Sequence, residues 1–469
     1  MDKTQGEILK EKLFDSKKIG WENLSIDKKR SIFSFNDDYI SFLNACKTER
    51  ECALFALKLL KDNEFENIEN KKTLKPGDKV YYINRKKAVY AAVIGSAMLE
   101  EGFNLVGAHI DSPRLDLKPN PLYETSNLAL FKTHYYGGIK KYQWTAIPLV
   151  IKGVIAKSDG QIINVNIGED NNDPIFTITD LLPHLASKQE KKTLGSGIAG
   201  EDLNVLVGSI PYNDEKVSEK VKLNILNILN NKYCITEKDF ISAELELVPA
   251  FEARSLGFDE SMIAAYGQDD RSCAYTTLRA LVDLDNPCRT CIALLADKEE
   301  IGSVGNTGMY SANFDVFIAK ILDMAGQNGF NVLEKTLCNS KMLSSDVTSA
   351  ADPTYADVDD TLNAAYLGKG ISLCKYTGHG GKGGANDASA EFVAKVRNIL
   401  DKNNLVYQMS DMGKVDEGGG GTIAYILANK GVDVIDCGVP VLSMHAPYEV
   451  TSKFDIYNAY EVYKAFYND

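Results

Sequence analysis

Short apolar runs alternate with amphipathic helical patterns along much of this chain. Each run is about as long as a strand and ends in polar residues, whereas the intervening segments repeat apolar residues at helical spacing. The runs are KAVYAAVIG (87–95), GFNLVGAHID (102–111), CRTCIALLADKEE (288–300), VFIAKILDMA (316–325) and VDVIDCGVPVLSMHAP (432–447), and the helical segments include SCAYTTLRALVDLD (272–285) and GANDASAEFVAKVRNILDK (384–402). This alternation predicts an α/β fold in which helices cover both faces of a sheet.

The regular alternation of strands and helices is lost in the middle of the chain. The segment AIPLVIKGVIAKSDGQIINVNIG (146–168) predicts strands around a turn, and ISAELELV (241–248) alternates like a half-exposed strand. Between them, VSEKVKLNILNILNNKY (217–233) has the apolar spacing of an amphipathic helix. We therefore predict a β-rich domain at 117–248, inserted into an α/β domain made of 1–116 and 249–469.

Composition and charge exclude several classes of function. The 469 residues carry 52 Lys and Arg against 65 Asp and Glu, a net charge of −13. A chain this acidic is a poor match for nucleic-acid phosphates or an anionic membrane surface. No apolar run approaches the ~18 residues needed to cross a bilayer. We expect neither nucleic-acid nor membrane partners.

The N-terminal sequence and the cysteines indicate the cellular compartment. The first residues, MDKTQGEILKEKLFDSKK, are charged throughout and lack the apolar core of a signal peptide. The nine cysteines are scattered and odd in number, which is more typical of a reducing compartment than of a disulfide framework. The sequence predicts a cytoplasmic protein.

Histidines follow two of the apolar runs. His109 ends FNLVGAH, and His445 follows VPVLSM. In sheets of this kind, sites form at the carboxyl ends of the strands, and imidazoles there suit metal binding. Asp111 lies two residues after His109, on the same side of an extended chain, so it could accept the other ring N–H. Taken alone, His-x-Asp also fits an ordinary structural histidine.

Carboxylates occupy comparable positions. Asp269 and Asp270 precede a helix, Glu299 and Glu300 follow a strand, and Asp346 follows MLSS. Each could be a helix cap or a solvated loop residue. Together with the two histidines they supply the ligands of a two-metal site, in which one carboxylate bridges the ions. One carboxylate would then be left to act as a base.

Five motifs, in order, resemble the M18 family of metalloaminopeptidases, which includes the aspartyl aminopeptidases. They are GAHIDSPRLDLKP, DDR before a helix, DKEEIGS, SSD and LSMHAPYE, spread over about 109–449. The resemblance implies a dizinc exopeptidase-like core and an inserted domain that serves dimerisation or substrate access. It also implies two divalent ions per subunit, most simply Zn²⁺, with Co²⁺ or Mn²⁺ as alternatives.

The resemblance also implies residue roles. His109 and Asp346 would bind one ion, and Glu300 and His445 the other. Asp269 would bridge both, with Asp270 as the alternative bridge. Glu299 would be the general base and Asp111 would orient His109.

The same resemblance extends to substrate recognition and assembly. His184, in DLLPHLASKQ, matches a substrate-contacting histidine that reaches a neighbouring subunit. Lys375 and Lys382 are candidates to bind an acidic N-terminal side chain of a peptide substrate, although TGHGGKGGAND is richer in glycine than the family pattern. The family implies a homo-oligomer, as large as a tetrahedral dodecamer.

Two other functions are compatible with parts of the pattern. A dizinc deacylase or carboxypeptidase could use the same core and ligands. A non-catalytic scaffold could keep the fold without the chemistry, but such proteins lose ligands, and here every ligand position is filled.

Overall fold

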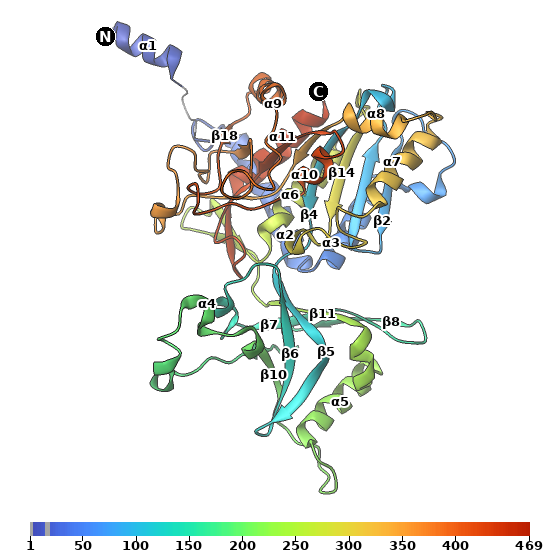
Figure 1. The fold of residues 1–469 in the computed structure, drawn as a ribbon, viewed down its shortest axis with the longest axis vertical. Helices are drawn as coiled ribbons and strands as arrows, with labels where there is room; N and C mark the ends of the chain where they lie inside the picture. Colours follow the sequence, from blue (N-terminus) through green and yellow to red (C-terminus); the bar gives the residue numbers. More distant parts are fainter. Residues whose placement is uncertain (1–2, 15–18) are drawn as a thin grey trace.

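A computed structural model describes residues 3–14 and 19–469. Its ribbon has two lobes, with the large α/β lobe above a smaller lobe built around β5–β8, β10, β11 and α5 (Figure 1). Helix α1 (Gln5–Leu13) has no buried residue and stands away from the large lobe (Figure 1). No helix in the described ranges is long and apolar enough to cross a membrane.

The large lobe contains a mixed nine-stranded sheet. Its strands, in spatial order, are β1 (Glu66–Asn67), β2 (Lys79–Asn84), β3 (Ala88–Val93), β14 (Cys291–Ala296), β4 (Asn104–His109), β15 (Lys341–Ser344), β19 (Asp433–Gly438), β17 (Ile371–Cys374) and β18 (Tyr407–Met409). The central strands β14, β4, β15 and β19 are parallel, so their carboxyl ends share one edge. Polar residues that follow these strands are thereby brought together.

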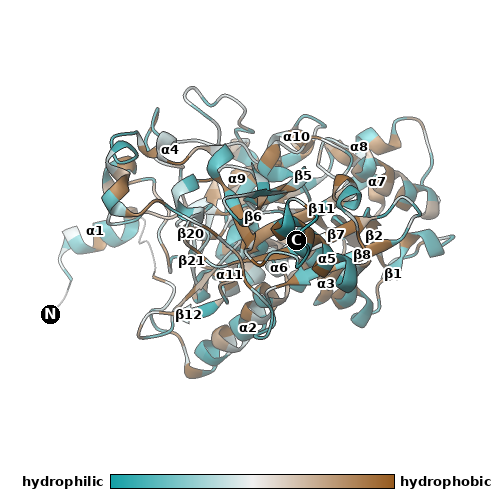
Figure 2. Ribbon diagram, turned by 90° about the horizontal axis from the view of Figure 1, so that it is seen from below, coloured by the Kyte–Doolittle hydropathy of each residue, from teal (hydrophilic) through white to brown (hydrophobic). Residues whose placement is uncertain are grey.

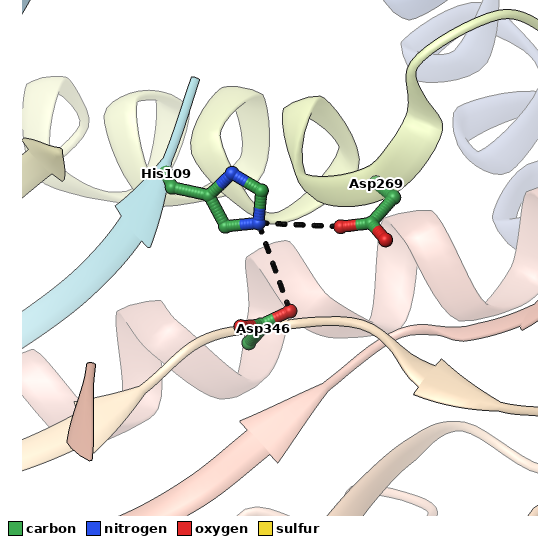
Figure 3. A group of neighbouring side chains, drawn as sticks. All are labelled: His109, Asp269 and Asp346. Atoms are coloured by element: carbon green, nitrogen blue, oxygen red, sulfur yellow. Dashed lines mark ion pairs between the residues drawn. The ribbon is translucent and has the colours of Figure 1, made fainter. Parts of the chain in front are cut away.

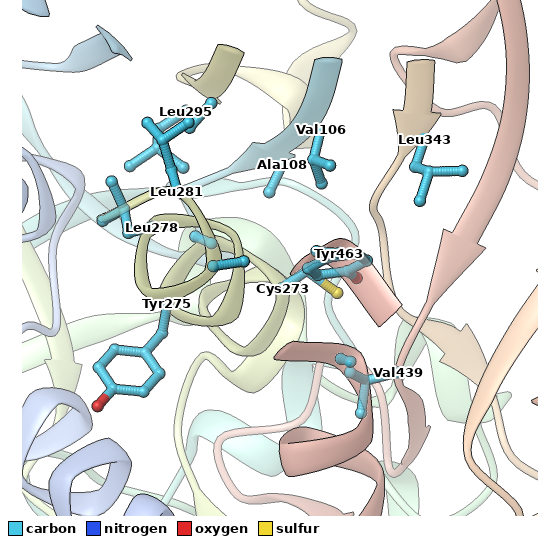
Figure 4. Packing of buried hydrophobic residues seen from close by; sticks show 14 of the residues in the cluster. Val106, Ala108, Cys273, Tyr275, Leu278, Leu281, Leu295, Leu343, Val439 and Tyr463 are labelled. Carbon is cyan, nitrogen blue, oxygen red and sulfur yellow. The ribbon is translucent and has the colours of Figure 1, made fainter. Parts of the chain in front are cut away.

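Helices cover both faces of this sheet, as predicted. One face packs against α2 (Ile26–Ala45), α3 (Glu49–Asp62), α6 (Gln268–Val282), α9 (Ala390–Lys402) and α11 (Lys453–Tyr467). The opposite face packs against α7 (Asn313–Met324), α8 (Val332–Cys338) and α10 (Ala424–Ala428). Figure 4 shows α6 lying against side chains of the central strands, and Figure 2 shows apolar segments gathered in the interior.

One predicted strand is wrong. The run VFIAKILDMA lies within α7, not in the sheet. Phe314, Phe317, Ile318, Ile321 and Leu322 are buried, at intervals of three and four residues that place them on one face of a helix. A short apolar run does not by itself distinguish a strand from a buried helix, and here the spacing decides it.

The smaller lobe is a seven-stranded sheet with one long helix. Its strands, in spatial order, are β8 (Ile162–Ile167), β7 (Leu149–Ala156), β11 (Ala243–Pro249), β5 (Arg114–Thr125), β6 (Leu128–Tyr136), β10 (Asn204–Gly208) and β9 (Thr177–Ile178). Helix α5 (Lys220–Tyr233) and the short α4 (Leu194–Gly197) belong to this lobe. The sheet has its own core around Trp144, separate from the two cores of the large lobe.

A third, five-stranded sheet lies beside the edge where the central strands end. It consists of β12 (Arg254–Leu256), β13 (Met262–Ala265), β21 (Glu449–Ser452), β20 (Pro440–Leu442) and β16 (Thr348–Ser349). Strand β13 leads into α6, and Ala265 pairs with Glu449 at the start of β21. This sheet therefore brings the segment before α6 next to the segment before β21.

Candidate metal and catalytic site

A cavity of about 430 Å³ lies at the carboxyl ends of the central strands. Its lining includes the last residue of β4, the start of α6, the turn after β14 and the loops after β15 and β20. Among its lining residues are His109, Asp269, Glu299, Glu300, Asp346 and His445. Six of the predicted site residues thus share one cavity.

These side chains form two groups that share Asp269. In the first group, His109 Nε2 lies 3.2 Å from Asp269 Oδ1 and 3.9 Å from Asp346 Oδ1 (Figure 3). In the second, His445 Nε2 lies 3.2 Å from Asp269 Oδ2 and 3.5 Å from Glu300 Oε2. Within each group the donor atoms all lie within 4.8 Å of one another. The two oxygens of Asp269 therefore face two different histidines.

Asp270 is placed differently from Asp269. Its Oδ2 accepts a hydrogen bond from the backbone N–H of His109 at 3.2 Å. It belongs to neither group of converging donor atoms in the described chain. Both aspartates have non-helical torsions at the start of α6, so each carboxylate takes its own direction.

Asp111 contacts both His109 and the Glu299–Glu300 turn. The Nδ1 atom of His109 lies 3.0 Å from the Asp111 carbonyl and 3.3 Å from Asp111 Oδ1. The carboxylate of Asp111 accepts from the backbone N–H groups of Glu299 and Glu300, each at 3.2 Å. Asp111 thus has a second set of partners besides the imidazole that the sequence suggested.

Glu299 and Glu300 lie in a 3₁₀ turn, Glu299–Ile301, directly after β14. The turn follows Lys298, which has a φ of +67°. Glu300 converges with His445 and Asp269, whereas Glu299 lines the cavity without joining either group. The two neighbouring carboxylates are therefore directed to different places.

Burial and mutual repulsion raise the pKa values of most of these carboxylates. Burial, with Asp111 and Asp269 nearby, raises the pKa of Glu299 to about 7. Burial and the charge of Asp269 raise the pKa of Glu300, and burial and the charge of Asp270 raise that of Asp346. Several carboxyl groups thus share a volume where they cannot all be charged without a compensating cation.

The pKa values of the two histidines and of Asp269 shift in the directions expected for oppositely charged partners. Burial opposes protonation of His445, but Asp269 and Glu300 outweigh it and raise its pKa to about 10. The pKa of His109 is raised in the same way by Asp111, Asp269 and Asp346. Burial raises the pKa of Asp269, but its contacts with the two histidines lower it overall. A metal ion binding here would displace these protons.

The three predicted substrate-binding residues lie outside the cavity lining. His184 is exposed in the 3₁₀ segment Pro183–Lys188 of the smaller lobe. Lys375 and Lys382 both pair with Asp387, at 2.9 and 3.2 Å. The Lys382 ammonium also lies 3.9 Å from the ring centroid of Tyr376, a lining residue.

The sequence did not predict the residues that hydrogen-bond to the site residues and hold them in place. Glu449, almost completely buried, accepts from the backbone N–H of Asp269 at 3.1 Å and of His445 at 2.8 Å. Tyr136 donates to Asp111 Oδ2 at 2.8 Å, and the carbonyl of Gly138 lies 2.8 Å from His445 Nδ1. Glu449 lies in the quoted motif LSMHAPYE, so its proximity to His445 was a usable signal. Tyr136 and Gly138 offered none, because they come from the other lobe.

Comparisons with known proteins agree on one family. Residues 42–467 match the family model described as Aminopeptidase I zinc metalloprotease (M18). The chain is 53% identical over 456 residues to the probable M18 family aminopeptidase 1 of Clostridium acetobutylicum, covering 96% of this chain and 98% of that protein.

Solved structures give the same result. The crystal structure of an M18 aminopeptidase from Thermotoga maritima is similar with a TM-score of 0.94 at 46% identity, covering 97% of this chain and 100% of that one. The aminopeptidase I structure from Clostridium acetobutylicum has a TM-score of 0.91 at 50% identity, with the same coverage. A Saccharomyces mApe1 dodecamer shares the fold, with a TM-score of 0.75 at 21% identity over 92% of this chain and 96% of that one.

Proposed function

We propose that this chain, which belongs to the M18 family of zinc aminopeptidases, removes N-terminal residues from peptides with two metal ions that share Asp269. The observation that carries the two-ion proposal is the placement of Asp269. Its oxygens face His109 and His445, each 3.2 Å away. A carboxylate shared between two nitrogen- and oxygen-donor groups is the arrangement that a two-metal centre requires.

The chemistry of the side chains supports metal binding. Glu300 Oε1 is buried and has no hydrogen-bond partner in the described part of the chain. An unpartnered buried carboxylate oxygen is costly unless a cation meets it. Imidazole and carboxylate donors suit Zn²⁺, and they also bind Co²⁺ or Mn²⁺. His109 and Asp346 would hold one ion, and Glu300 and His445 the other.

The ions, when bound, supply a polarised scissile carbonyl and a water of lowered pKa. Glu299 is then placed to act as the base, because it lines the cavity without joining either donor group. In the metal-free site, burial raises the pKa of Glu299 above its usual range, and a general base works best when its pKa is not far from the working pH. Asp111 fixes the position of Glu299 through the backbone N–H at 3.2 Å.

The cavity lining favours neutral over acidic N-terminal side chains. None of the described residues that line it is a lysine or an arginine, whereas Tyr376, Met412 and Gly419–Gly421 contribute apolar or uncharged surface. Recognition of an N-terminal Asp or Glu would depend on Lys375 or Lys382, and both already pair with Asp387. We therefore propose that Leu- and Met-peptides are better substrates than Asp- and Glu-peptides.

Assembly into a homo-oligomer is also part of the proposal. Leu181, Leu182, Leu185 and Leu194 are each between 46% and 67% exposed on the smaller lobe, around His184. Clustered exposed leucines are typical of a protein interface. A second copy covering them would bring His184 into contact with a neighbouring subunit. The tetrahedral dodecamer remains the largest assembly that we propose.

A panel of matched peptides tests the activity. We expect zinc-loaded protein to release the first residue from Leu-Ala-Ala and Met-Ala-Ala, more slowly from Glu-Ala-Ala, and not from the N-acetylated forms. A deacylase would prefer the acetylated forms, and a carboxypeptidase would release the last residue. A scaffold would hydrolyse none of them.

A further inference from the structure

One strand end from the smaller lobe touches the candidate site at three points. The segment Tyr136–Gly138 ends β6 and continues past it. Tyr136 donates to Asp111 Oδ2 at 2.8 Å, and the Gly138 carbonyl lies 2.8 Å from His445 Nδ1. A Cβ atom placed on Gly137 would lie 3.3 Å from Glu300 Oε2. The segment therefore lies against Asp111, Glu300 and His445.

The contact at His445 determines which ring nitrogen is free. A backbone carbonyl only accepts hydrogen bonds, so the neutral imidazole must carry its hydrogen on Nδ1 when it meets Gly138. The other nitrogen, Nε2, is then bare and faces Asp269 Oδ2 and Glu300 Oε2 at 3.2 and 3.5 Å. This is the tautomer that a metal-binding histidine needs.

The contact at Asp111 is tied to the rest of the smaller lobe. The guanidinium of Arg114 lies 3.9 Å from the ring centroid of Tyr136. Arg114 is itself buried against Glu246 of β11, at 3.2 Å, and Glu49 of α3, at 3.6 Å. Tyr136 is thereby fixed between the two lobes, and its hydroxyl holds Asp111 beneath the Glu299–Glu300 turn.

We propose that the Tyr136–Gly138 segment is a positioning element of the smaller lobe for the two-metal centre, in which Gly137 and Gly138 prepare the Glu300–His445 half and Tyr136 acts through Asp111. This inference rests on the proposed function and adds a role for the smaller lobe beyond assembly and access. The segment fixes the tautomer of His445, limits the space beside Glu300 and supports Asp111. The contacts of Gly137 and Gly138 lie on the Glu300–His445 half, whereas Asp111 also contacts His109 of the other half.

Gly137 and Gly138 have little room for a side chain. Gly137 has a φ of +73°, a conformation that side chains other than glycine rarely adopt. A Cβ on Gly138 would lie only 3.3 Å from His445 Nδ1, and a larger side chain would push the imidazole away from its carbonyl partner. Gly138 is exposed at the rim of the cavity, so the core does not need to repack around a substitution there.

Calorimetric titration of metal-free protein with zinc tests the proposal without relying on turnover. We expect the wild type to bind two ions. In Gly138→Val, one ion should bind as in the wild type and the other at least ~10-fold more weakly, the range found when partners of metal-binding histidines are lost. Gly195→Val is the matched control, because no atom lies within 4 Å of its Cβ position in the same lobe; it should bind both ions normally.

A nearly isosteric variant gives a second, kinetic readout. Tyr136→Phe removes only the hydroxyl that meets Asp111, so kcat should fall at least ~10-fold while KM changes less than twofold. Tyr135→Phe, at a neighbour that is 42% exposed, should leave both constants unchanged. Two normally bound ions in Gly138→Val, or equal weakening of both, would overturn the proposal, as would normal kcat in Tyr136→Phe. Fewer than two ions in the wild type would overturn the proposed function as well.

Discussion

Glu299 and Glu300 are adjacent in the chain but have different surroundings. Glu300 lies 3.5 Å from His445 Nε2, whereas Glu299 lines the cavity apart from both donor groups. The 3₁₀ turn that begins at Glu299 separates their directions, and Asp111 accepts both of their backbone N–H groups. A metal ligand and a free base can therefore come from neighbouring positions.

Replacing Glu299 tests its role as the base. We expect Glu299→Gln to lower kcat by about 10²- to 10⁴-fold, because the amide cannot accept the proton of the water. Zinc content and KM should change little, since Glu299 lies outside both donor groups. Steady-state kinetics and metal analysis measure both quantities. Glu252→Gln, at an exposed position, is the control and should keep full activity. Full activity in Glu299→Gln would exclude Glu299 as the base.

Replacing Asp269 tests the sharing of one carboxylate. We expect Asp269→Asn to weaken binding of both zinc ions, because its two oxygens face the two groups. Glu300→Gln, which touches one group only, should weaken one ion and spare the other. Competition with a chromogenic chelator measures each step. If Asp270→Asn loses both ions while Asp269→Asn keeps them, the shared carboxylate has been assigned to the wrong residue.

At the scale of elements, residues at strand ends were predictable and contacts between lobes were not. His109 ends β4 and Glu299 follows β14, and because these strands are parallel their ends must meet. The same logic fails for Tyr136 and Gly138, whose position depends on how the smaller lobe packs back onto the larger one. It also fails for VFIAKILDMA, where length and apolar content suit a strand but the spacing of buried residues makes α7.

The buried charges between the lobes are expected to matter for stability. Arg114, on β5, is 6% exposed and pairs with Glu49, Asp116 and Glu246. We expect Arg114→Ala to lower the free energy of unfolding by about 3–5 kcal/mol, because it leaves buried carboxylates without their cation. Chemical denaturation measures the change. Arg254→Ala, at a 71% exposed side chain, should cost less than about 1 kcal/mol; equal effects of the two would contradict this account.

At the scale of the whole molecule, the smaller lobe has two separate surfaces. One carries Tyr136 and Gly138 toward the cavity, and the other exposes Leu182 and Leu185 around His184. A lobe with this layout can connect assembly to the site of its own chain. With a net charge of −13, copies of the chain repel one another at long range. Such an assembly would therefore depend mainly on apolar contacts.

A charge placed among the exposed leucines tests the assembly. We expect the wild type to sediment as a species well above the 51.6 kDa of one chain. Leu185→Asp should shift it toward the monomer, because the charge would be buried in the interface without a partner. Leu54→Asp, at a 54% exposed position of α3, is the control. A monomeric wild type would contradict the proposed assembly.

The most direct test of the central claim is the anomalous scattering of zinc in crystals of the zinc-loaded protein. Two peaks should appear about 3.5–4 Å apart, on either side of the Asp269 carboxylate. One peak should contact His109 and Asp346, and the other Glu300 and His445. A single peak, or a pair of peaks that does not share Asp269, would contradict the claim.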